Sequence, residues 1–308
     1  MGATEMIDKI SKQLLKAIAG LHEIPQGAIS FRKNGKSEIC RSTANIEIEK
    51  KLDCDGINVF VHSTCKGEAC HIPVVVSENN FSDLVYNDFY IEDGAEVLIV
   101  AGCGVHSDGE GGHDGIHSFH IGKNAKVTYV ENHLAIGKGK KKTLNPTTKV
   151  SVGEGSVMVM NTTQIGGVDY SNRNTEAALK RNATLEVNEK ILTDRFEVAK
   201  TKFKVNLAGK NSKCNIISKS VAKGESEQIF KSNLIGKNLC FGRVECDAIL
   251  LDEAIVCSEP KVSALHKEAT LNHEATIGKI ANEQLIKLMT LGLTEKKAEE
   301  KIIEGFLK

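Results

Sequence analysis

Two cysteines in this sequence are followed, 27 to 30 residues later, by residues that could share their chemistry. Cys103 is followed by His133, and Cys246 is followed by His273 and Glu274. Thiolate, imidazole and carboxylate groups can all bind iron, and a thiolate can also attack a sulfur–sulfur bond. If the fold places residues one such interval apart side by side, each group would form a site for metal or sulfur chemistry.

A glycine-rich segment over residues 106–120 holds four imidazoles and three carboxylates. The histidines are His106, His113, His117 and His120. Such a set could capture a divalent metal, including Fe(II). The H-x6-H-x3-H-x2-H spacing matches no standard site, and a polar, solvated turn is the alternative interpretation.

A third group, near the N-terminus, is Cys65-x4-Cys70-His71, with Cys54 and His62 nearby. A zinc site usually needs a second ligand pair, and none follows, so scattered thiols near strand ends are the favoured interpretation. The nine cysteines are an odd number in a long chain without a recognisable signal peptide. This pattern favours reduced thiols and a cytoplasmic location.

The elements that would position these residues repeat along the chain. Period-two runs such as AEVLIV and AKVTYV predict strands, and each is preceded by two turn residues and a small residue. The small position is occupied by Ala95, Ala125, Ser156, Ala183, Ser212, Leu239, Ala254 and Ala269. The steps are 27 to 31 residues and then twice 15, which indicates stacked coils of two strand-and-turn units each.

The predicted fold is mainly β, a right-handed parallel β-helix, with a β-sandwich as the alternative. An apolar stripe from Ile7 to Leu21 predicts an N-terminal helix, and two capped apolar patterns after residue 281 predict a C-terminal αα-hairpin. We therefore expect a helical segment over 1–40, the β-helix over 41–280 and the hairpin over 281–308. Adjacent coils would make Cys103 and His133 direct neighbours, and would put Cys246 and His273 about one coil apart.

Composition excludes several classes of function. Forty basic residues balance forty acidic ones, so neither nucleic acid nor an anionic membrane is the expected partner. No apolar run is long enough to cross a bilayer. The sequence has neither a phosphate-binding GxxxxGK[ST] loop nor a Ser-His-Asp nucleophile motif, so we expect a scaffold rather than an enzyme, with any ATP hydrolysis supplied by a partner.

The last 70 residues closely resemble the C-terminal region of the SufB and SufD proteins. The resemblance is carried by RVECDAILLDEAIVCSEPKVSAL and by HEATIGKIANEQLIKLMTLGLTEKKAEEKIIEGFLK, and a second block, DGAEVLIVAGC to IHSFHIGKNAKVTY, extends it to about residue 80. It implies a parallel β-helix that builds a transient iron–sulfur cluster, of 4Fe-4S type, from iron and from sulfur brought by a donor protein. It also implies a SufC-type ABC ATPase docked on the C-terminal helices, and either a homodimer or a pair with a SufD-like chain.

The same resemblance implies roles for individual residues. Cys246 matches the cluster-site cysteine of SufB, His273 matches a SufD histidine, and Glu274 matches a SufB glutamate. The SufD-type cysteine two residues before His273 is replaced by Leu271, so the ligand set departs from the family pattern.

Cys103 matches a SufB cysteine that resembles a sulfur acceptor. Glu131 and Asn132 stand where SufB has Gln and Asn in its proposed sulfur path, and His133 replaces a Trp. A protonated His133 beside Cys103 would lower the pKa of its thiol and favour the reactive thiolate.

Two other functions remain open from the residues themselves. Many parallel β-helices act on polysaccharides, although low aromatic content argues against sugar stacking here. The other alternative is a metal-binding chaperone centred on the histidine-rich segment.

Overall fold

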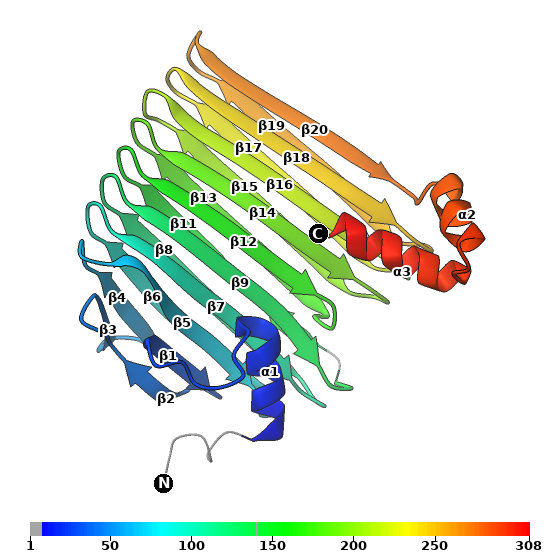
Figure 1. Cartoon of the computed structure of the whole chain (residues 1–308), viewed down its shortest axis with the longest axis horizontal. Helices are drawn as coiled ribbons and strands as arrows, with labels where there is room; N and C mark the ends of the chain where they lie inside the picture. Colours follow the sequence, from blue (N-terminus) through cyan, green and yellow to red (C-terminus); the bar gives the residue numbers. More distant parts are fainter. Residues whose placement is uncertain (1–7, 140) are drawn as a thin grey trace.

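The computed structural model describes residues 8–139 and 141–308. It consists of two long sheets that face each other and are built from successive coils of the chain, each coil giving one strand to each sheet (Figure 1). Neighbouring strands are parallel except in the pairs β1–β2 and β3–β4, which lie at the N-terminal end. The predicted parallel β-helix is confirmed.

The first sheet, called sheet A, has ten strands in the order β2-β1-β5-β7-β9-β12-β14-β16-β18-β20. Its strands are β1 (Ala28–Lys33), β2 (Lys36–Arg41), β5 (Lys66–Val76), β7 (Glu96–His106), β9 (Lys126–Ile136), β12 (Val157–Ile165), β14 (Thr184–Thr193), β16 (Ser212–Ala222), β18 (Cys240–Leu250) and β20 (Ala269–Gly278).

The facing sheet, sheet B, runs from β3 at one end to β19 at the other, with β10 and β11 sharing one level between β8 and β13. Its strands are β3 (Ile46–Lys50), β4 (Gly56–Val61), β6 (Phe81–Ile91), β8 (Gly111–Ile121), β10 (Lys142–Leu144), β11 (Thr147–Val152), β13 (Tyr170–Leu179), β15 (Val198–Leu207), β17 (Glu227–Gly236) and β19 (Ile255–Ala264).

The repeated turn phrase has a direct structural cause. The residue before the small position has a positive φ angle in five successive coils, and it is glycine or asparagine each time: Gly94, Asn124, Gly155, Asn182 and Asn211. These two residue types tolerate the left-handed region best. The small residue that follows is completely buried at Ala95, Ala125, Ser156, Ala183 and Ser212. The tight turn therefore requires glycine or asparagine, and the close stacking of coils requires a small residue directly after it.

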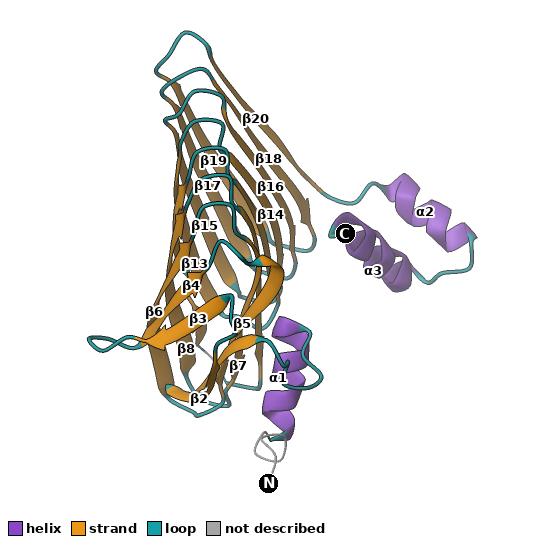
Figure 2. Ribbon diagram, turned by 60° about the vertical axis from the view of Figure 1, so that its left-hand side comes forward, coloured by secondary structure: helices purple, strands orange, loops and turns teal. Residues whose placement is uncertain are grey.

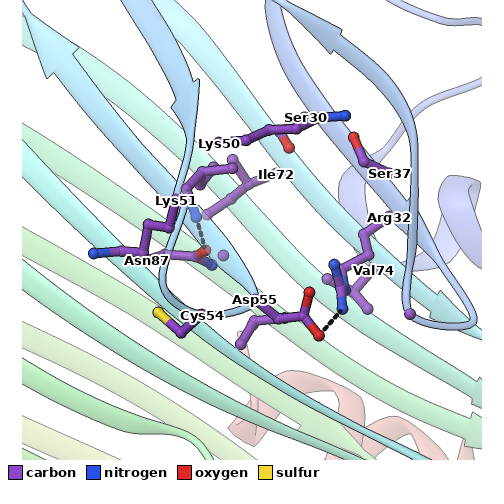
Figure 3. Close-up of a pocket in the computed structure, with 14 residues that line it drawn as sticks. Ser30, Arg32, Ser37, Lys50, Lys51, Cys54, Asp55, Ile72, Val74 and Asn87 are labelled. Atoms are coloured by element: carbon purple, nitrogen blue, oxygen red, sulfur yellow. Dashed lines mark hydrogen bonds and ion pairs between the residues drawn. The ribbon is translucent and has the colours of Figure 1, made fainter.

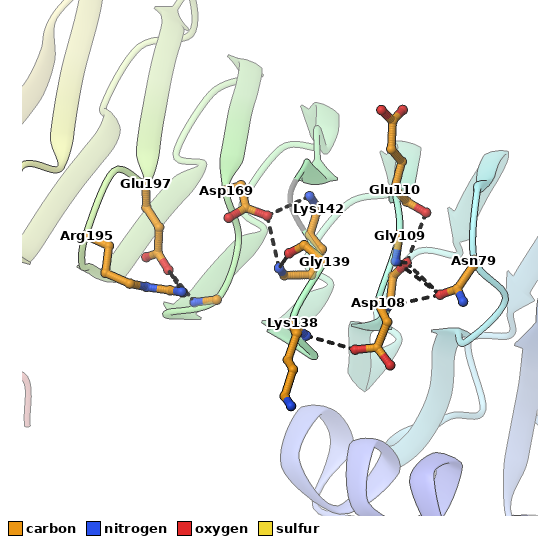
Figure 4. Close-up of polar contacts among 12 residues, drawn as sticks. Asn79, Asp108, Gly109, Glu110, Lys138, Gly139, Lys142, Asp169, Arg195 and Glu197 are labelled. Atoms are coloured by element: carbon orange, nitrogen blue, oxygen red, sulfur yellow. Dashed lines mark hydrogen bonds and ion pairs between the residues drawn. The ribbon is translucent and has the colours of Figure 1, made fainter.

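Turns of adjacent coils are also linked by side chains that accept hydrogen bonds from the backbone of the neighbouring coil (Figure 4). Asn79 Oδ1 accepts from Asp108 N at 3.0 Å, and Asp108 Oδ1 in turn accepts from Lys138 N at 3.0 Å. Asp169 accepts from Lys142 N at 2.8 Å in the same way. These contacts supply partners to turn N–H groups that no strand can satisfy.

Stacked turns approach so closely that one glycine has no room for a methyl group. A Cβ on Gly153 would lie 1.9 Å from the carbonyl oxygen of Gly122. We expect Gly153→Ala to lower the free energy of unfolding by about 1–3 kcal/mol, because the coils must move apart. Urea unfolding should show this loss, whereas Gly305→Ala, where nothing lies within 4 Å, should change stability by less than about 1 kcal/mol. Equal stability of both variants would mean that the coils are not stacked this tightly.

Three helices lie on the same side of the β-helix, next to sheet A (Figure 2). Helix α1 (Lys9–Ala19) packs on β5, β7 and β9, and the hairpin of α2 (Asn282–Thr290) and α3 (Glu295–Phe306) adjoins the far end. The N-terminal helix and the C-terminal hairpin are thus confirmed. The helical segment is shorter than the predicted 1–40, since residues 28–41 form the hairpin β1–β2 of sheet A; Ile7 lies outside the described residues.

Candidate functional site

Cys103 and His133 are direct neighbours on β7 and β9, as the repeat predicts. Both side chains are buried and face the space between the sheets. They line a cavity of about 20 Å³, which has room for about one water molecule. Across this cavity, His113 and His117 on β8 complete the wall.

A buried network of charges continues from this cavity along the interior. Arg173 on β13 forms an ion pair with Glu131, donates a hydrogen bond from Nη2 to His133 Nδ1 at 3.2 Å, and lies 3.8 Å from Glu189. His133 Nε2 lies 3.4 Å from Glu131 Oε1. Because Arg173 donates to Nδ1, the proton of a neutral His133 is on Nε2, and both ring nitrogens are occupied.

Burial controls the ionisation of this region. It lowers the pKa values of His133 and His117, the latter to about 4, and it raises the pKa of Cys103 well above its usual value. Burial alone would also raise the pKa of Glu131, but Arg173 and His133 hold it well below its usual range. His133 is therefore neutral and not the expected imidazolium, and it lies beside a protonated Cys103 thiol. Burial disfavours the charged ring more strongly than the nearby Glu131 carboxylate favours it.

The raised pKa gives a test of this arrangement. At pH 8 we expect iodoacetamide to modify Cys103 far more slowly than the exposed Cys257, because only the thiolate reacts and burial removes it. Peptide mapping of a time course should show the difference, and the Cys103 rate should still be rising above pH 9. A Cys103 rate equal to that of Cys257 would show that the interior is open to solvent.

Polar side chains connect this region with Cys246. Glu189 accepts hydrogen bonds from Ser218 Oγ at 2.8 Å and from Thr201 Oγ1 at 3.1 Å. Ser218 is the register neighbour of Cys246 on β18. We call the series Glu131, Arg173, Glu189 and Ser218 the interior polar path. It runs along the interior, where other polar side chains such as Thr162 and Ser232 are also buried, from β9, beside the strand of Cys103, to β16, beside the strand of Cys246.

Cys246 lies near the C-terminal end of the β-helix, buried and facing the interior, with a thiol pKa that burial raises to about 11. It pairs in register with Ala275, so His273 is one strand across and two residues back, on the same face. Strand spacing and rise make this diagonal on the order of 8 Å between backbone positions. Over residues 8–139 and 141–308, the buried His273 Nε2 has no hydrogen-bond partner. The prediction that Cys246 and His273 lie about one coil apart is confirmed, and their offset along the strands is two residues.

Glu274 does not share that face. Side chains alternate along a strand, so Glu274 points outward, where it accepts hydrogen bonds from Arg243 Nη2 and Asn272 Nδ2, both at 2.9 Å. A cluster of Cys246, His273 and Glu274 within one chain is therefore not formed, contrary to expectation. The roles of these residues as ligands stay predictions.

The same alternation divides the histidine-rich segment. His113 and His117 face the interior, whereas His120 is exposed on the outer face and stacks on Tyr90 with ring centroids 4.9 Å apart. His106 lies at the end of β7. Asn132 also points outward, donating from Nδ2 to Ile18 O of α1 at 2.8 Å, and so it anchors the helix and does not line the interior.

A larger cavity of about 250 Å³ opens at the N-terminal end (Figure 3). It shares the lining residues Ile72, Val74 and Asn87 with the small cavity at Cys103. Its wall includes Arg32, and Cys54 is at its edge. The larger cavity therefore adjoins the small one, and the side chains of Ile72, Val74 and Asn87 lie between it and the Cys103 thiol.

The remaining N-terminal thiols do not converge. Cys65 donates to the carbonyl oxygen of Glu96 at 3.1 Å, Cys70 is enclosed in the apolar core, and His62 pairs with Glu92. Across residues 8–139 and 141–308, no three His, Cys, Asp or Glu side chains form a preassembled metal site. Over the same residues, no helix is both long and apolar enough to span a bilayer.

Sequence reasoning missed the interior charges. Arg173 and Glu189 occupy buried positions of β13 and β14 that alternate with half-buried residues, where the pattern calls for apolar side chains. The signal in the sequence was a charged residue at an inward position of a strand. Recognising that Arg173 and Glu189 meet required the register of both sheets.

Comparison with known proteins agrees with this geometry. A family model for the SufBD core domain of SUF system FeS cluster assembly matches residues 77–306. An iron-sulfur cluster assembly SufBD family protein of Archaeoglobus fulgidus is 28% identical over 266 residues, which are 85% of this chain and 71% of the relative. A SufBD family protein of Methanocaldococcus jannaschii is 29% identical over 242 residues, 77% of this chain and 75% of the relative.

A SufBD family protein of Methanothermobacter thermautotrophicus is 26% identical over 244 residues, 78% of this chain and 58% of the relative. The match therefore extends across the β-helix and the C-terminal hairpin, which hold all the residues described above except those of the N-terminal end. The chain belongs to the SufBD family, and its function is iron–sulfur cluster assembly.

Proposed function

We propose that this chain is a cytoplasmic scaffold that takes up sulfur at Cys103 and assembles a labile 4Fe-4S cluster at Cys246 and His273. The observation that supports it best is the interior polar path, which links the levels of these two cysteines through the core. Buried ion pairs seldom add net stability compared with apolar packing. Their presence along one line between two thiols favours a role in transfer.

The sulfur step is a thiol–persulfide exchange. The Cys103 sulfur attacks the outer sulfur of a persulfide on the donor protein, a new S–S bond forms at Cys103, and the donor leaves as a thiolate that takes the Cys103 proton. Burial slows this attack, but it also shields the resulting persulfide from solvent. Release of the sulfur as hydrosulfide consumes two electrons from an external thiol reductant.

The C-terminal end of the β-helix, where Cys246 and His273 lie, offers few ligands and would therefore hold a cluster weakly. Cys246 offers one thiolate and His273 one imidazole, and iron is held most firmly by several thiolates. Strands β19 and β20 are the last of their sheets among the described residues, and their side chains are largely exposed. Edge strands of this kind pair readily with another chain, which supports a homodimer or a pair with a SufD-like chain at this end.

The C-terminal hairpin is the proposed docking element for a SufC-type ATPase. Helix α3 is fixed to the sheet through Ile303, whereas Ile286 and Leu291 beside it are exposed. We expect Ile286→Glu combined with Leu291→Glu to abolish co-purification with a co-expressed SufC-type ATPase. Phe196→Glu, at another exposed apolar position, should leave it intact. Unchanged co-purification of the hairpin variant would reject the docking surface.

A further inference from the structure

His113 and His117 are two imidazoles on β8 that face the small interior cavity without complete hydrogen bonding. Each residue is only 6% exposed, and the Nδ1 atom of each is buried with no hydrogen-bond partner among the described residues. An unpaired buried polar atom costs about 1–3 kcal/mol, so native proteins usually supply a partner. His113 Nδ1 faces Asp83 at 3.6 Å, so the ring nitrogens that border the cavity are the Nε2 atoms of His113 and His117.

The Nε2 atoms of His113 and His117 both lie close to Gly115. A Cβ on Gly115, between them in sequence, would lie 2.6 Å from His117 Nε2 and 3.4 Å from His113 Nε2. Glycine therefore leaves open the space that both Nε2 atoms border. The cavity volume of about 20 Å³ suits a single atom-sized ligand and excludes a larger one.

The surroundings of His113 Nδ1, the ring nitrogen that faces away from the cavity, resemble those of a metal-binding histidine. Its Nδ1 lies 3.6 Å from Asp83 Oδ2, and Arg32 holds that carboxylate through two hydrogen bonds of 2.7 and 2.8 Å. A carboxylate behind one ring nitrogen commonly orients the other nitrogen toward a metal. The ring of His117 is stacked on Phe89 with an interplanar angle of 9°, which fixes its direction.

His133, the third imidazole at this cavity, has partners at both of its ring nitrogens. Arg173 and Glu131 occupy its two nitrogens. Of the three described imidazoles that line the cavity, His113 and His117 are therefore the two whose Nε2 atoms are free, with the Cys103 thiol across from them.

We propose that His113 and His117 bind one divalent transition-metal ion of the Fe(II) class inside the β-helix, at the level of Cys103. Two imidazole ligands leave coordination positions open on the side of Cys103, where an incoming sulfur atom would bind the metal. The site adds to the proposed function a place for iron next to the sulfur acceptor. The binding itself does not depend on Cys246, so its failure can be told apart from failure of cluster assembly.

The test is anaerobic titration of the purified full-length chain with Co²⁺, followed by ligand-field absorption, in a Cys246→Ala background. One Co²⁺ per chain should bind, and His117→Gln should weaken the affinity at least roughly tenfold. Gly115→Ala should do the same while keeping both imidazoles, because its methyl group fills the metal position. His120→Gln, on the outer face of the same strand, should bind as the parent does.

Circular dichroism of each variant checks that the β-helix is retained. Absence of Co²⁺ binding by the parent would overturn the proposal. So would full affinity in folded Gly115→Ala, or a loss caused by His120→Gln instead of His117→Gln.

Discussion

Replacing Cys246 with alanine should remove most of the iron–sulfur absorption that the chain acquires on anaerobic reconstitution with iron and sulfide. Cys246 is a buried thiol on the inward face, one strand across and two residues along from His273, whose Nε2 is unpaired among the described residues. Loss of a ligand thiolate should reduce the bound cluster by roughly tenfold or more. The charge-transfer bands and the iron and sulfide contents measure this directly.

The matched control is Cys214→Ala. Cys214 is also buried and inward-facing on β16, and burial raises its thiol pKa to about 12. It lies among apolar residues of the core, so its removal should affect packing but not the cluster. Equal losses in both variants would mean that Cys246 acts through packing alone.

The second large effect concerns stability. Arg173 is the only cation bonded to both buried carboxylates of the interior polar path within the described residues, Glu131 and Glu189. Arg173→Met would leave these two acids buried without their partner, and breaking a buried pair in this way typically costs about 3–5 kcal/mol. Urea unfolding at pH 7 should show that loss.

Arg181→Met provides the comparison for Arg173→Met. Arg181 also pairs with a glutamate, Glu154, but its side chain is 63% exposed. Solvent screens such a pair, and its removal should change the free energy of unfolding by less than about 1 kcal/mol. Similar losses in the two variants would mean that water reaches Arg173 and that the interior is not enclosed.

Much of this architecture could be predicted from the spacing of residues alone. Cys103 and His133 are separated by one coil of the repeat, and β-helix stacking converts that sequence distance into direct contact. The turn residues Gly94 and Asn124 carry the signal, because each coil needs a left-handed residue before a buried small one. Period and turn chemistry are local properties that a single sequence displays.

The faces of the strands and the ionisation of buried groups could not be predicted this way. Glu274 follows His273 directly, so one of the two had to point outward, but which one depends on the register with β18. The neutral state of His133 results from desolvation by both sheets. Strands β1 and β2 replaced part of the expected helical segment because they complete sheet A on β5, a tertiary contact that local patterns do not encode.

The most direct test of the central claim is an isotope competition during cluster assembly. The chain receives iron, a thiol reductant, a donor protein whose persulfide carries a heavy sulfur isotope, and an excess of unlabelled free sulfide. If sulfur passes from Cys103 through the interior to Cys246, the wild-type cluster will be enriched in the heavy isotope, while Cys103→Ala will build a cluster with the isotope ratio of the solution. A wild-type cluster with the ratio of the solution would contradict the account.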